Sequence, residues 1–313
     1  MAHMSFLTIS QFKIMGGVLA AAFLLSVSCS DPNPTSLIFS NGQAAAVKFE
    51  QADKLVLLQA QVENSRPLWF VLDSGSSRML IDKKVADSLG LKAEGSSSVG
   101  GAGAGRVPIS LIHDLSIRIG RLKSDHYEFA STDLSGLAPI IGRPIDGILG
   151  YEFLSRFVVT VDYARRQVVI RAPQSAFVPP GIPIPIEIVR KWPFVKARLA
   201  VEGVPPVVDS FLIDSGSGDA VDHPLVKQSK GEVRRTTTGN GLGQPVSGYV
   251  GTAESLEIGP LRLEHLPLAC CGGTEETSKL IGSDVLSRYT VTFDYPHSRI
   301  FLAPRSDPSA TKP

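Results

Sequence analysis

Short apolar runs separated by turn residues recur along the chain from about residue 50 onward. Lys54–Glu63 and Ile184–Val201 are rich in Val, Leu and Ile, and each leads through a turn into a further apolar run. Runs of this length and composition favour β-strands. Further along each half, a short apolar segment ends at Asp82 or at Asp222. Each of these two residues precedes a brief candidate helix, at 83–89 and at 223–228. The pattern predicts an all-β protein with many short strands and a few short helices.

The chain contains an internal repeat. The segment Leu68–Asp82 (LWFVLDSGSSRMLID) matches Ser210–Asp222 (SFLIDSGSGDAVD), and the match aligns Asp73 with Asp214. Each of these two Asp residues follows an apolar strand and opens an Asp-Ser-Gly-Ser turn. One such turn would carry little information, because Asp, Ser and Gly are common in ordinary turns. Two of them at equivalent places are a stronger signal.

A second pair of matching segments marks the other end of the repeat. Ile148–Tyr163 matches Leu280–Tyr295, which aligns Gly150 with Gly282. The two landmarks lie closer together in the second half. This indicates a net deletion, which we place in the loops between them. A repeat that keeps both landmarks predicts two homologous lobes.

Composition places the boundaries of these lobes. Residues 172–185 contain five prolines and predict a stiff, extended linker. The lobes are then expected at 47–171 and 186–303, with a C-terminal tail at 304–313. A formal net charge of +1 and a hydrophobic content of 43% argue against disorder and against a strongly charged surface. Nucleic acid is therefore not an expected partner.

The N-terminal residues predict export. Lys13 precedes the apolar run Ile14–Leu25, which small residues follow, and this order is typical of a secretory signal peptide, here 1–28. As a helix, about 12 apolar residues would span only about 18 Å, too short for a membrane anchor. We expect this segment to be removed.

Cys29, at the end of that segment, resembles the lipobox cysteine of bacterial lipoproteins, which carries lipid as the first mature residue. Leu25 lies one position further from the cysteine than the usual Leu, so ordinary cleavage after Ser28 stays open. Residues 29–46 have the composition of a tether. The expected location is the periplasm or, as a lipoprotein, the membrane of a bacterial cell envelope, with membrane contact only through lipid on Cys29.

The other two cysteines, Cys270 and Cys271, are adjacent and cannot link distant loops. We expect two small buried residues, with a disulfide between them as the alternative.

Each half also carries a glycine-rich stretch after its Asp-Ser-Gly turn, Gly100–Gly105 (GGAGAG) and Gly239–Gly243 (GNGLG). No Gly-Lys-Ser/Thr follows either stretch, and the dinucleotide-binding spacing is absent, so a phosphate loop is not predicted. We predict hairpin tips in which glycine supplies positive φ.

Two carboxylates at equivalent places suggest a hydrolytic site. Held about 3 Å apart they cannot both ionise, so they share one proton. One group can then deprotonate a water molecule while the other protonates a carbonyl oxygen. No His-Glu-x-x-His, Gly-x-Ser-x-Gly or close His pair occurs, so neither a metal, a cofactor nor a serine nucleophile is expected.

The paired motifs Val71–Ser76 and Leu212–Ser217, each with an apolar-apolar-Gly segment downstream, resemble the signature of retropepsin-like and pepsin-like aspartic peptidases. The resemblance covers about residues 50 to 303. It implies an acid-protease fold with two pseudo-symmetric β-barrel lobes paired within one monomeric chain. It also implies catalysis by Asp73 and Asp214 on an extended polypeptide lying between the lobes.

The resemblance assigns roles to the neighbouring residues as well. Ser74 and Ser215 would grip the opposite lobe, Gly75 and Gly216 would allow close approach in the turn, and the hydroxyls of Ser76 and Ser217 would hydrogen-bond the carboxylates. Such a bond would favour an acidic optimum. The glycine-rich stretches fall where the family carries flaps. The candidate flap residues are Gly100, Gly101, Gly103, Gly105, Gly239, Gly241 and Gly243.

The second lobe departs from the first after its motif. Gly218 replaces Ser77, and Asp219 and Asp222 stand where Arg78 and Ile81 stand in the first lobe. This divergence motivates a second hypothesis, a non-catalytic module that binds peptide in the cleft. Four further matched residues are expected to serve the structure, by turn capping or packing: Asp162, Asp294, Arg156 and Arg288.

Overall fold

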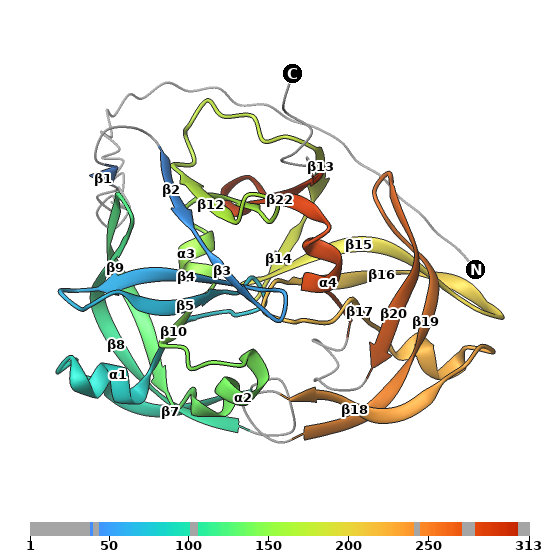
Figure 1. The fold of residues 1–313 in the computed structure, drawn as a ribbon, viewed down its shortest axis with the longest axis horizontal. Helices are drawn as coiled ribbons and strands as arrows, with labels where there is room; N and C mark the ends of the chain where they lie inside the picture. Colours follow the sequence, from blue (N-terminus) through green and yellow to red (C-terminus); the bar gives the residue numbers. More distant parts are fainter. Residues whose placement is uncertain (1–37, 40–43, 101–105, 241–244, 271–278, 306–313) are drawn as a thin grey trace, which may run out of the picture. The chain divides into compact units, whose positions relative to one another are not determined.

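The computed structural model describes residues 38–39, 44–100, 106–240, 245–270 and 279–305 (Figure 1). The predicted signal peptide, 1–28, and Cys29 lie outside the described residues. In the described part the chain is mainly β, with two sheets that each close on themselves and a third that is shared by the two halves of the chain. No helix among the described residues is long and apolar enough to cross a membrane.

The first closed sheet comes from the N-terminal half, coloured blue to green in Figure 1. Its strands follow the order β9-β6-β10-β5-β4-β8, and pairing of β8 with β9 closes the ring. The ring strands are β4 (Leu55–Val62), β5 (Leu68–Leu72), β6 (Met79–Asp82), β8 (Arg106–Ile119), β9 (Leu122–Thr132) and β10 (Gly147–Leu149). The strands added at its edges are β1 (Ile38–Phe39), β3 (Glu50–Ala52) and β7 (Glu94–Gly100).

The second closed sheet repeats this arrangement in the C-terminal half. Its order is β20-β17-β21-β16-β15-β19, closed by pairing of β19 with β20. The ring strands are β15 (Trp192–Val201), β16 (Val204–Asp214), β17 (Val221–Asp222), β19 (Pro245–Ile258), β20 (Leu261–Cys270) and β21 (Leu280–Gly282). The edge strands are β14 (Glu187–Val189) and β18 (Arg234–Asn240).

Strand directions match between the two rings. β10 runs parallel to β5 and antiparallel to β6, and β21 runs parallel to β16 and antiparallel to β17. Because a closed sheet has no free edge, each half can form a barrel around its own apolar interior. The prediction of an all-β fold with two pseudo-symmetric barrel lobes is confirmed.

A six-stranded sheet joins the lobes. It contains β13 (Ile182–Pro185), β23 (Arg299–Pro304), β22 (Tyr289–Asp294), β11 (Val158–Asp162), β12 (Gln167–Arg171) and β2 (Ala44–Lys48), in that order. Its central strands β11 and β22 are equivalent in the repeat, and they pair antiparallel with Thr160 opposite Thr292. The hydroxyls of these two residues lie 2.9 Å apart. A residue paired with its own repeat partner marks a pseudo-two-fold axis.

The shared sheet corrects the predicted ends of the lobes. The expected tether, 29–46, includes part of β2, and its residues 38–39 form β1. The expected linker, 172–185, ends in β13, and Pro304 of the expected tail belongs to β23. β2 and β13 are the edge strands of the sheet, where proline is tolerated because one side of the strand needs no ladder hydrogen bond. Composition alone therefore missed two strands that complete the sheet.

The helices are short, as predicted. The side chain of Asp82 accepts hydrogen bonds from the backbone N–H groups of Lys84 and Val85 and so caps α1. In the second lobe the helix is a 3-10 turn capped by His223 and not by Asp222, because Asp222 is still paired in β17. The helical segments are α1 (Lys83–Ser88), η1 (Ser135–Leu137), α2 (Ala138–Ile141), α3 (Tyr151–Leu154), η2 (Pro224–Gln228), α4 (Ser283–Leu286) and η3 (Tyr295–His297).

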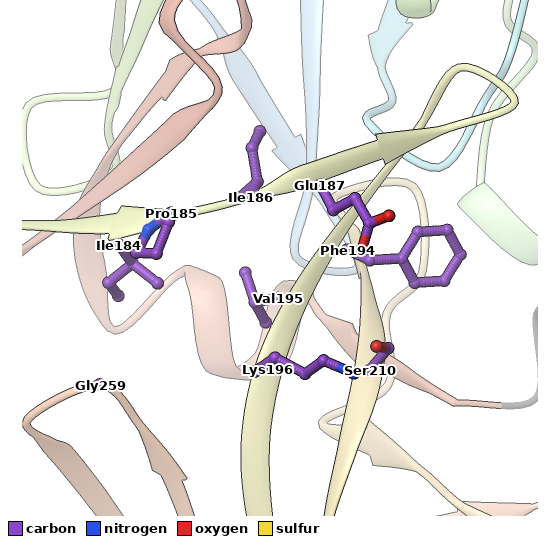
Figure 2. Close-up of a pocket in the computed structure, with 9 residues that line it drawn as sticks. All are labelled: Ile184, Pro185, Ile186, Glu187, Phe194, Val195, Lys196, Ser210 and Gly259. Carbon is purple, nitrogen blue, oxygen red and sulfur yellow. The ribbon is translucent and has the colours of Figure 1, made fainter. Parts of the chain in front are cut away.

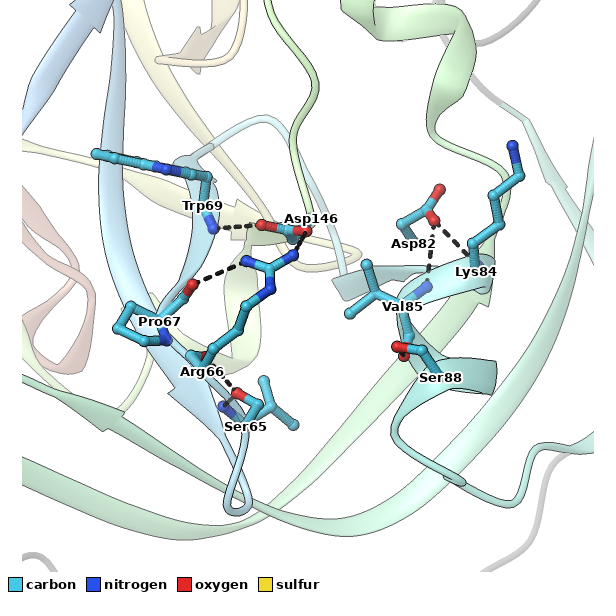
Figure 3. A network of polar contacts seen from close by, with 10 residues as sticks. Ser65, Arg66, Pro67, Trp69, Asp82, Lys84, Val85, Ser88 and Asp146 are labelled. Atoms are coloured by element: carbon cyan, nitrogen blue, oxygen red, sulfur yellow. Dashed lines mark hydrogen bonds and ion pairs between the residues drawn. The ribbon is translucent and has the colours of Figure 1, made fainter.

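A polar network fixes the strand that leads to Asp73 (Figure 3). The carboxylate of Asp146 accepts the backbone N–H of Trp69 at 2.7 Å and the guanidinium of Arg66 at 3.2 Å. The backbone carbonyl of Asp146 accepts the N–H of Asp82 at 2.8 Å. Since Asp146 immediately precedes β10, these contacts tie the start of β10 to both β5 and β6.

Three further predictions concern single residues. Asp162 caps a turn by accepting the backbone N–H of Arg165 at 2.9 Å, as expected. Arg156 donates to the carbonyls of Asp125 and His126, which is a structural role. Cys270 is buried, as expected, but it is disulfide-bonded, and its partner lies outside the described residues.

Candidate active site

Asp73 and Asp214 lie at the C-terminal ends of equivalent strands. Asp73 directly follows β5 and Asp214 ends β16, and each strand is held by a parallel neighbour, β10 or β21. The backbone N–H of Asp73 donates to the carbonyl of Leu149 at 3.0 Å. Gly150 and Gly282 pass so close behind the turns that a Cβ on either would overlap a backbone carbonyl. The apolar-apolar-Gly segments therefore fix the position of both Asp turns.

The two Asp-Ser-Gly turns meet each other across the pseudo-two-fold axis. A Cβ on Gly75 would overlap the carboxylate of Asp214, and a Cβ on Gly216 would overlap that of Asp73. Each glycine also donates its N–H to the Asp of its own turn, at 2.8 Å to Asp73 and 2.9 Å to Asp214. Each of the two carboxylates therefore contacts both turns. As a result, Asp73 and Asp214, which are far apart in the sequence, lie in one site.

The serines that follow the two Asp residues lock the turns together. The hydroxyl of Ser74 donates to the carbonyl of Ile213 at 2.7 Å and accepts the N–H of Ser215 at 2.9 Å. The hydroxyl of Ser215 donates to the carbonyl of Leu72 and accepts the N–H of Ser74, both at 2.9 Å. Both serines are 1% exposed. These four buried hydrogen bonds across the lobes form the grip that the resemblance implies.

Residues 58–153 match the family model described as Aspartyl protease. The matched segment includes Asp73 and Ile148–Gly150, and it ends before the second lobe. The assignment of Asp214 to the same site rests on the internal repeat and on the contacts described above. A comparison with curated proteins found no match.

Burial within the site shapes the acidity of both carboxyls. Burial and the nearby charge of Asp214 raise the pKa of Asp73 well above its ordinary value. Burial also raises the pKa of Asp214, while the backbone N–H of Gly216 and the contact with Asp73 oppose the rise. The contact between the two carboxyls raises the pKa of Asp73 and opposes the rise in the pKa of Asp214, as expected when one proton is shared between them.

The cross-lobe grip predicts a stability effect for Ser74→Ala. Loss of this hydroxyl leaves the carbonyl of Ile213 and the N–H of Ser215 buried without a partner. We expect the free energy of unfolding to fall by about 1–3 kcal/mol per unsatisfied group, as measured by urea denaturation. Ser77→Ala, in the same turn but outside the grip, is the control. Equal stability of Ser74→Ala and wild type would show that the grip is energetically unimportant.

The hydroxyls of Ser76 and Ser217 are not where the resemblance places them. The hydroxyl of Ser76 donates to the carbonyl of Arg78 at 2.9 Å, and that of Ser217 contacts the carboxylate of Asp219 at 3.2 Å. The backbone N–H of each serine, and not its hydroxyl, lowers the pKa of the neighbouring Asp. Each hydroxyl points away from the Asp carboxylate because a residue two positions further along the same loop offers an acceptor. The predicted hydroxyl bonds, and the acidic shift expected from them, are therefore absent.

Two hydroxyl groups beneath the turns were missed from the sequence. Tyr295 donates its hydroxyl to the carbonyl of Ser74 at 3.3 Å, and Ser283 donates to the carbonyl of Ser215 at 2.9 Å. Ser283 also hydrogen-bonds Tyr163, the repeat partner of Tyr295. The repeated Asp-Tyr pair was a signal for these tyrosines, whereas nothing in the sequence singled out Ser283. Together they fix the carbonyls that follow the two Asp residues.

The described ends of both glycine-rich stretches lie in antiparallel strand pairs, which agrees with the predicted hairpins. β7 and β8 pair up to Gly100 opposite Arg106, and β18 and β19 pair with Gly239 opposite Val246. The remaining flap candidates, namely Gly101, Gly103, Gly105, Gly241 and Gly243, lie outside the described residues.

Strand pairing corrects the predicted place of Asp222. Leu80 lies opposite Ile148 in the first lobe, and Asp222 lies opposite Leu280 in the second. Since Ile148 and Leu280 are repeat partners, Asp222 occupies the place of Leu80 and not that of Ile81. The second lobe therefore has one residue more between its turn and β17, which a gap-free sequence match could not show.

Asp222 is 5% exposed, and its Oδ1 has no hydrogen-bond partner. Burial, followed by the charges of Asp219 and Asp214, raises its pKa to about 8. The folded pKa lies above the ordinary value of 3.8, so this carboxyl costs stability as pH rises from about 4 toward 8.

Asp222→Asn should therefore stabilise the protein at neutral pH. We expect a gain on the order of 3 kcal/mol near pH 7 and almost none near pH 3, since the unfolded carboxyl is then largely protonated. Denaturation at both pH values measures the difference, with the exposed acid variant Asp87→Asn as control. A pH-independent difference between Asp222→Asn and wild type would contradict the assigned pKa.

A separate apolar pocket lies on the second lobe (Figure 2). It is lined by Ile184–Glu187, Phe194–Lys196, Ser210 and Gly259, and none of these belongs to either Asp turn. Within the described residues, no group of three His, Cys, Asp or Glu side chains could hold a metal ion. Among the described residues, the two facing Asp turns are therefore the site whose side chains suggest a chemical reaction.

Proposed function

We propose that this protein is an aspartic-type endopeptidase that hydrolyses peptide bonds with a water molecule activated between Asp73 and Asp214. The observation that carries the proposal is the reciprocal contact of the two turns, in which each glycine lies against the carboxylate of the opposite lobe. The match of residues 58–153 to an aspartyl protease family model supports it. The assay is digestion of an unfolded polypeptide with wild type and with the two Asp variants.

The acidity of the two carboxyls suggests their roles. We assign the ionised form, which takes a proton from water, to Asp214, because the contact between the two carboxyls lowers the pKa of Asp214 and raises that of Asp73. Asp73 holds the shared proton and donates it to the carbonyl oxygen of the scissile bond. The water oxygen bonds to the carbonyl carbon and gives a tetrahedral intermediate. Asp214 then returns its proton to the leaving nitrogen as the carbon–nitrogen bond breaks, and one hydroxyl of the intermediate returns a proton to Asp73.

A bell-shaped dependence of kcat/KM on pH follows from this scheme. Activity should rise as Asp214 ionises and fall as Asp73 loses its proton. Both pKa values are raised, so both limbs should lie above the ordinary value of 3.8. Activity at about pH 5 should exceed activity at about pH 3 in a fluorogenic peptide assay. An optimum below the ordinary Asp value would contradict the assignment.

The substrate we propose is a polypeptide in extended conformation. The hairpins β7–β8 and β18–β19 are candidates for flaps that cover it and exclude water. Because both Asp turns come from one chain, the proposed active unit is a monomer. The apolar run after Lys13 supports export to a bacterial cell envelope, in the periplasm or as a lipoprotein through Cys29.

A second candidate is a module that binds peptide without cleaving it. The altered turn of the second lobe favours it, because Gly218 and Asp219 replace Ser77 and Arg78 next to Asp214. Absence of cleavage between about pH 3 and pH 8, together with retained peptide binding, would support this candidate over the peptidase.

A further inference from the structure

Asp222 lies on the face of the second barrel that carries Asp214. Leu212 precedes Asp214 by two positions on β16, so their side chains share a face. Leu280 is paired beside Leu212, and Asp222 is paired beside Leu280. Neighbouring side chains paired across strands lie on the same face. One continuous row therefore runs from Asp214 through two leucines to Asp222.

The equivalent row of side chains in the first lobe is apolar. Val71, Ile148 and Leu80 occupy the equivalent places and belong to one hydrophobic cluster. Replacing Leu80 of that cluster by an acid would be unfavourable without a compensating partner, because a buried carboxyl needs a hydrogen bond or an opposite charge. In the second lobe, Asp222 occupies the place of Leu80 and is buried, so it carries this unfavourable free energy.

No partner for Asp222 is present among the described residues. Its Oδ1 is fully enclosed and makes no hydrogen bond. The charged groups that act on it are Asp219 and Asp214, both acidic. Lys54, the nearby base that acts on Asp219, forms its ion pair with Asp284 at 2.7 Å. Three carboxyls thus share one part of the site, and no cation in the described part of the chain forms an ion pair with Asp222.

We propose that Asp222 is a specificity-determining residue that binds a Lys or Arg side chain of the polypeptide substrate close to the scissile bond. An ammonium or guanidinium group at the exposed edge of Asp222 would supply the opposite charge that its carboxyl lacks and would ionise it on binding. Asp219 and Asp214 would strengthen the attraction, because their charges have the same sign. The matching place in the first lobe, at Leu80, accepts an apolar side chain.

This inference rests on the proposed function for its cleavage readout, and peptide binding tests it independently. The probes are two fluorescent peptides that differ only in carrying Lys or norleucine near the scissile bond. Wild type should bind and cleave the Lys peptide better, and Asp222→Asn should lower that preference roughly 10- to 100-fold. Asp222→Leu, which restores the residue of the first lobe, should prefer the norleucine peptide. Glu254→Gln, which removes an exposed acid from the same lobe, should leave the preference unchanged.

The outcomes separate the two claims. A Lys preference in binding that Asp222→Asn removes, without cleavage by wild type, supports this inference and refutes the peptidase. Cleavage with the same Lys-to-norleucine ratio in wild type and Asp222→Asn overturns the inference alone. Failure of wild type both to bind and to cleave either peptide overturns both. If Asp222→Asn does not fold, Asp222→Leu gives the same comparison.

Discussion

Asp73→Asn and Asp214→Asn should each reduce cleavage of an unfolded polypeptide by roughly 10²–10⁴-fold. Each substitution keeps the size of the side chain and removes a carboxyl that the mechanism needs, either as proton donor or as proton acceptor. Because the two carboxyls act as a unit, the double variant should be little worse than either single variant. The initial rate of a fluorogenic peptide assay measures the loss.

Asp87→Asn is the matched control, because Asp87 is an exposed acid that pairs with Lys83 on α1. It should retain the wild-type rate. Circular dichroism should show that Asp73→Asn and Asp214→Asn are folded, since amides can occupy the same space. Full activity in either of these two variants would rule out the shared-carboxyl mechanism.

Gly75→Ala and Gly216→Ala should also abolish most activity, although neither residue is titratable. In each variant the new methyl group would overlap the carboxylate of the opposite lobe, so the two turns must separate. A displacement of the order of 1 Å can cost about 100-fold in rate. Overpacking at this contact should also lower the free energy of unfolding by about 1–3 kcal/mol.

Gly136→Ala is the control for this pair, because a Cβ on Gly136 would meet no atom within 4 Å. Its activity and stability should match those of wild type in the same peptide and denaturation assays. If Gly75→Ala and Gly216→Ala cleave peptide as fast as Gly136→Ala, the two turns do not meet as described.

The internal repeat made the architecture predictable. Two matching landmarks, each with an apolar strand and a glycine, defined two barrels, and strand pairing of β10 and β21 behind the Asp turns agrees with that expectation. Local capping was readable in the first lobe, where Asp82 caps α1, but not in the second, where His223 caps η2 in place of Asp222. These features depend on short segments whose residue types determine their conformation.

Features that depend on contacts between distant segments were not predictable. The edge strands β2 and β13 lie in segments whose composition resembles linkers, and they form because the shared sheet offers them a partner. From the sequence, the hydroxyls of Ser76 and Ser217 could donate either to the preceding Asp carboxylate or to a group further along the same loop. Only the folded loop shows that they do the latter. The place of Asp222 required the pairing register, because a single additional residue shifts every side chain to the other face.

The measurement that tests the central claim most directly is calorimetric titration of the protein with a peptide analogue of the tetrahedral intermediate. If Asp73 and Asp214 form one site within one chain, the stoichiometry should be one inhibitor per chain, and binding should weaken at least about 100-fold in Asp73→Asn and in Asp214→Asn alike. One inhibitor per two chains, or binding unaffected by either substitution, would contradict the account.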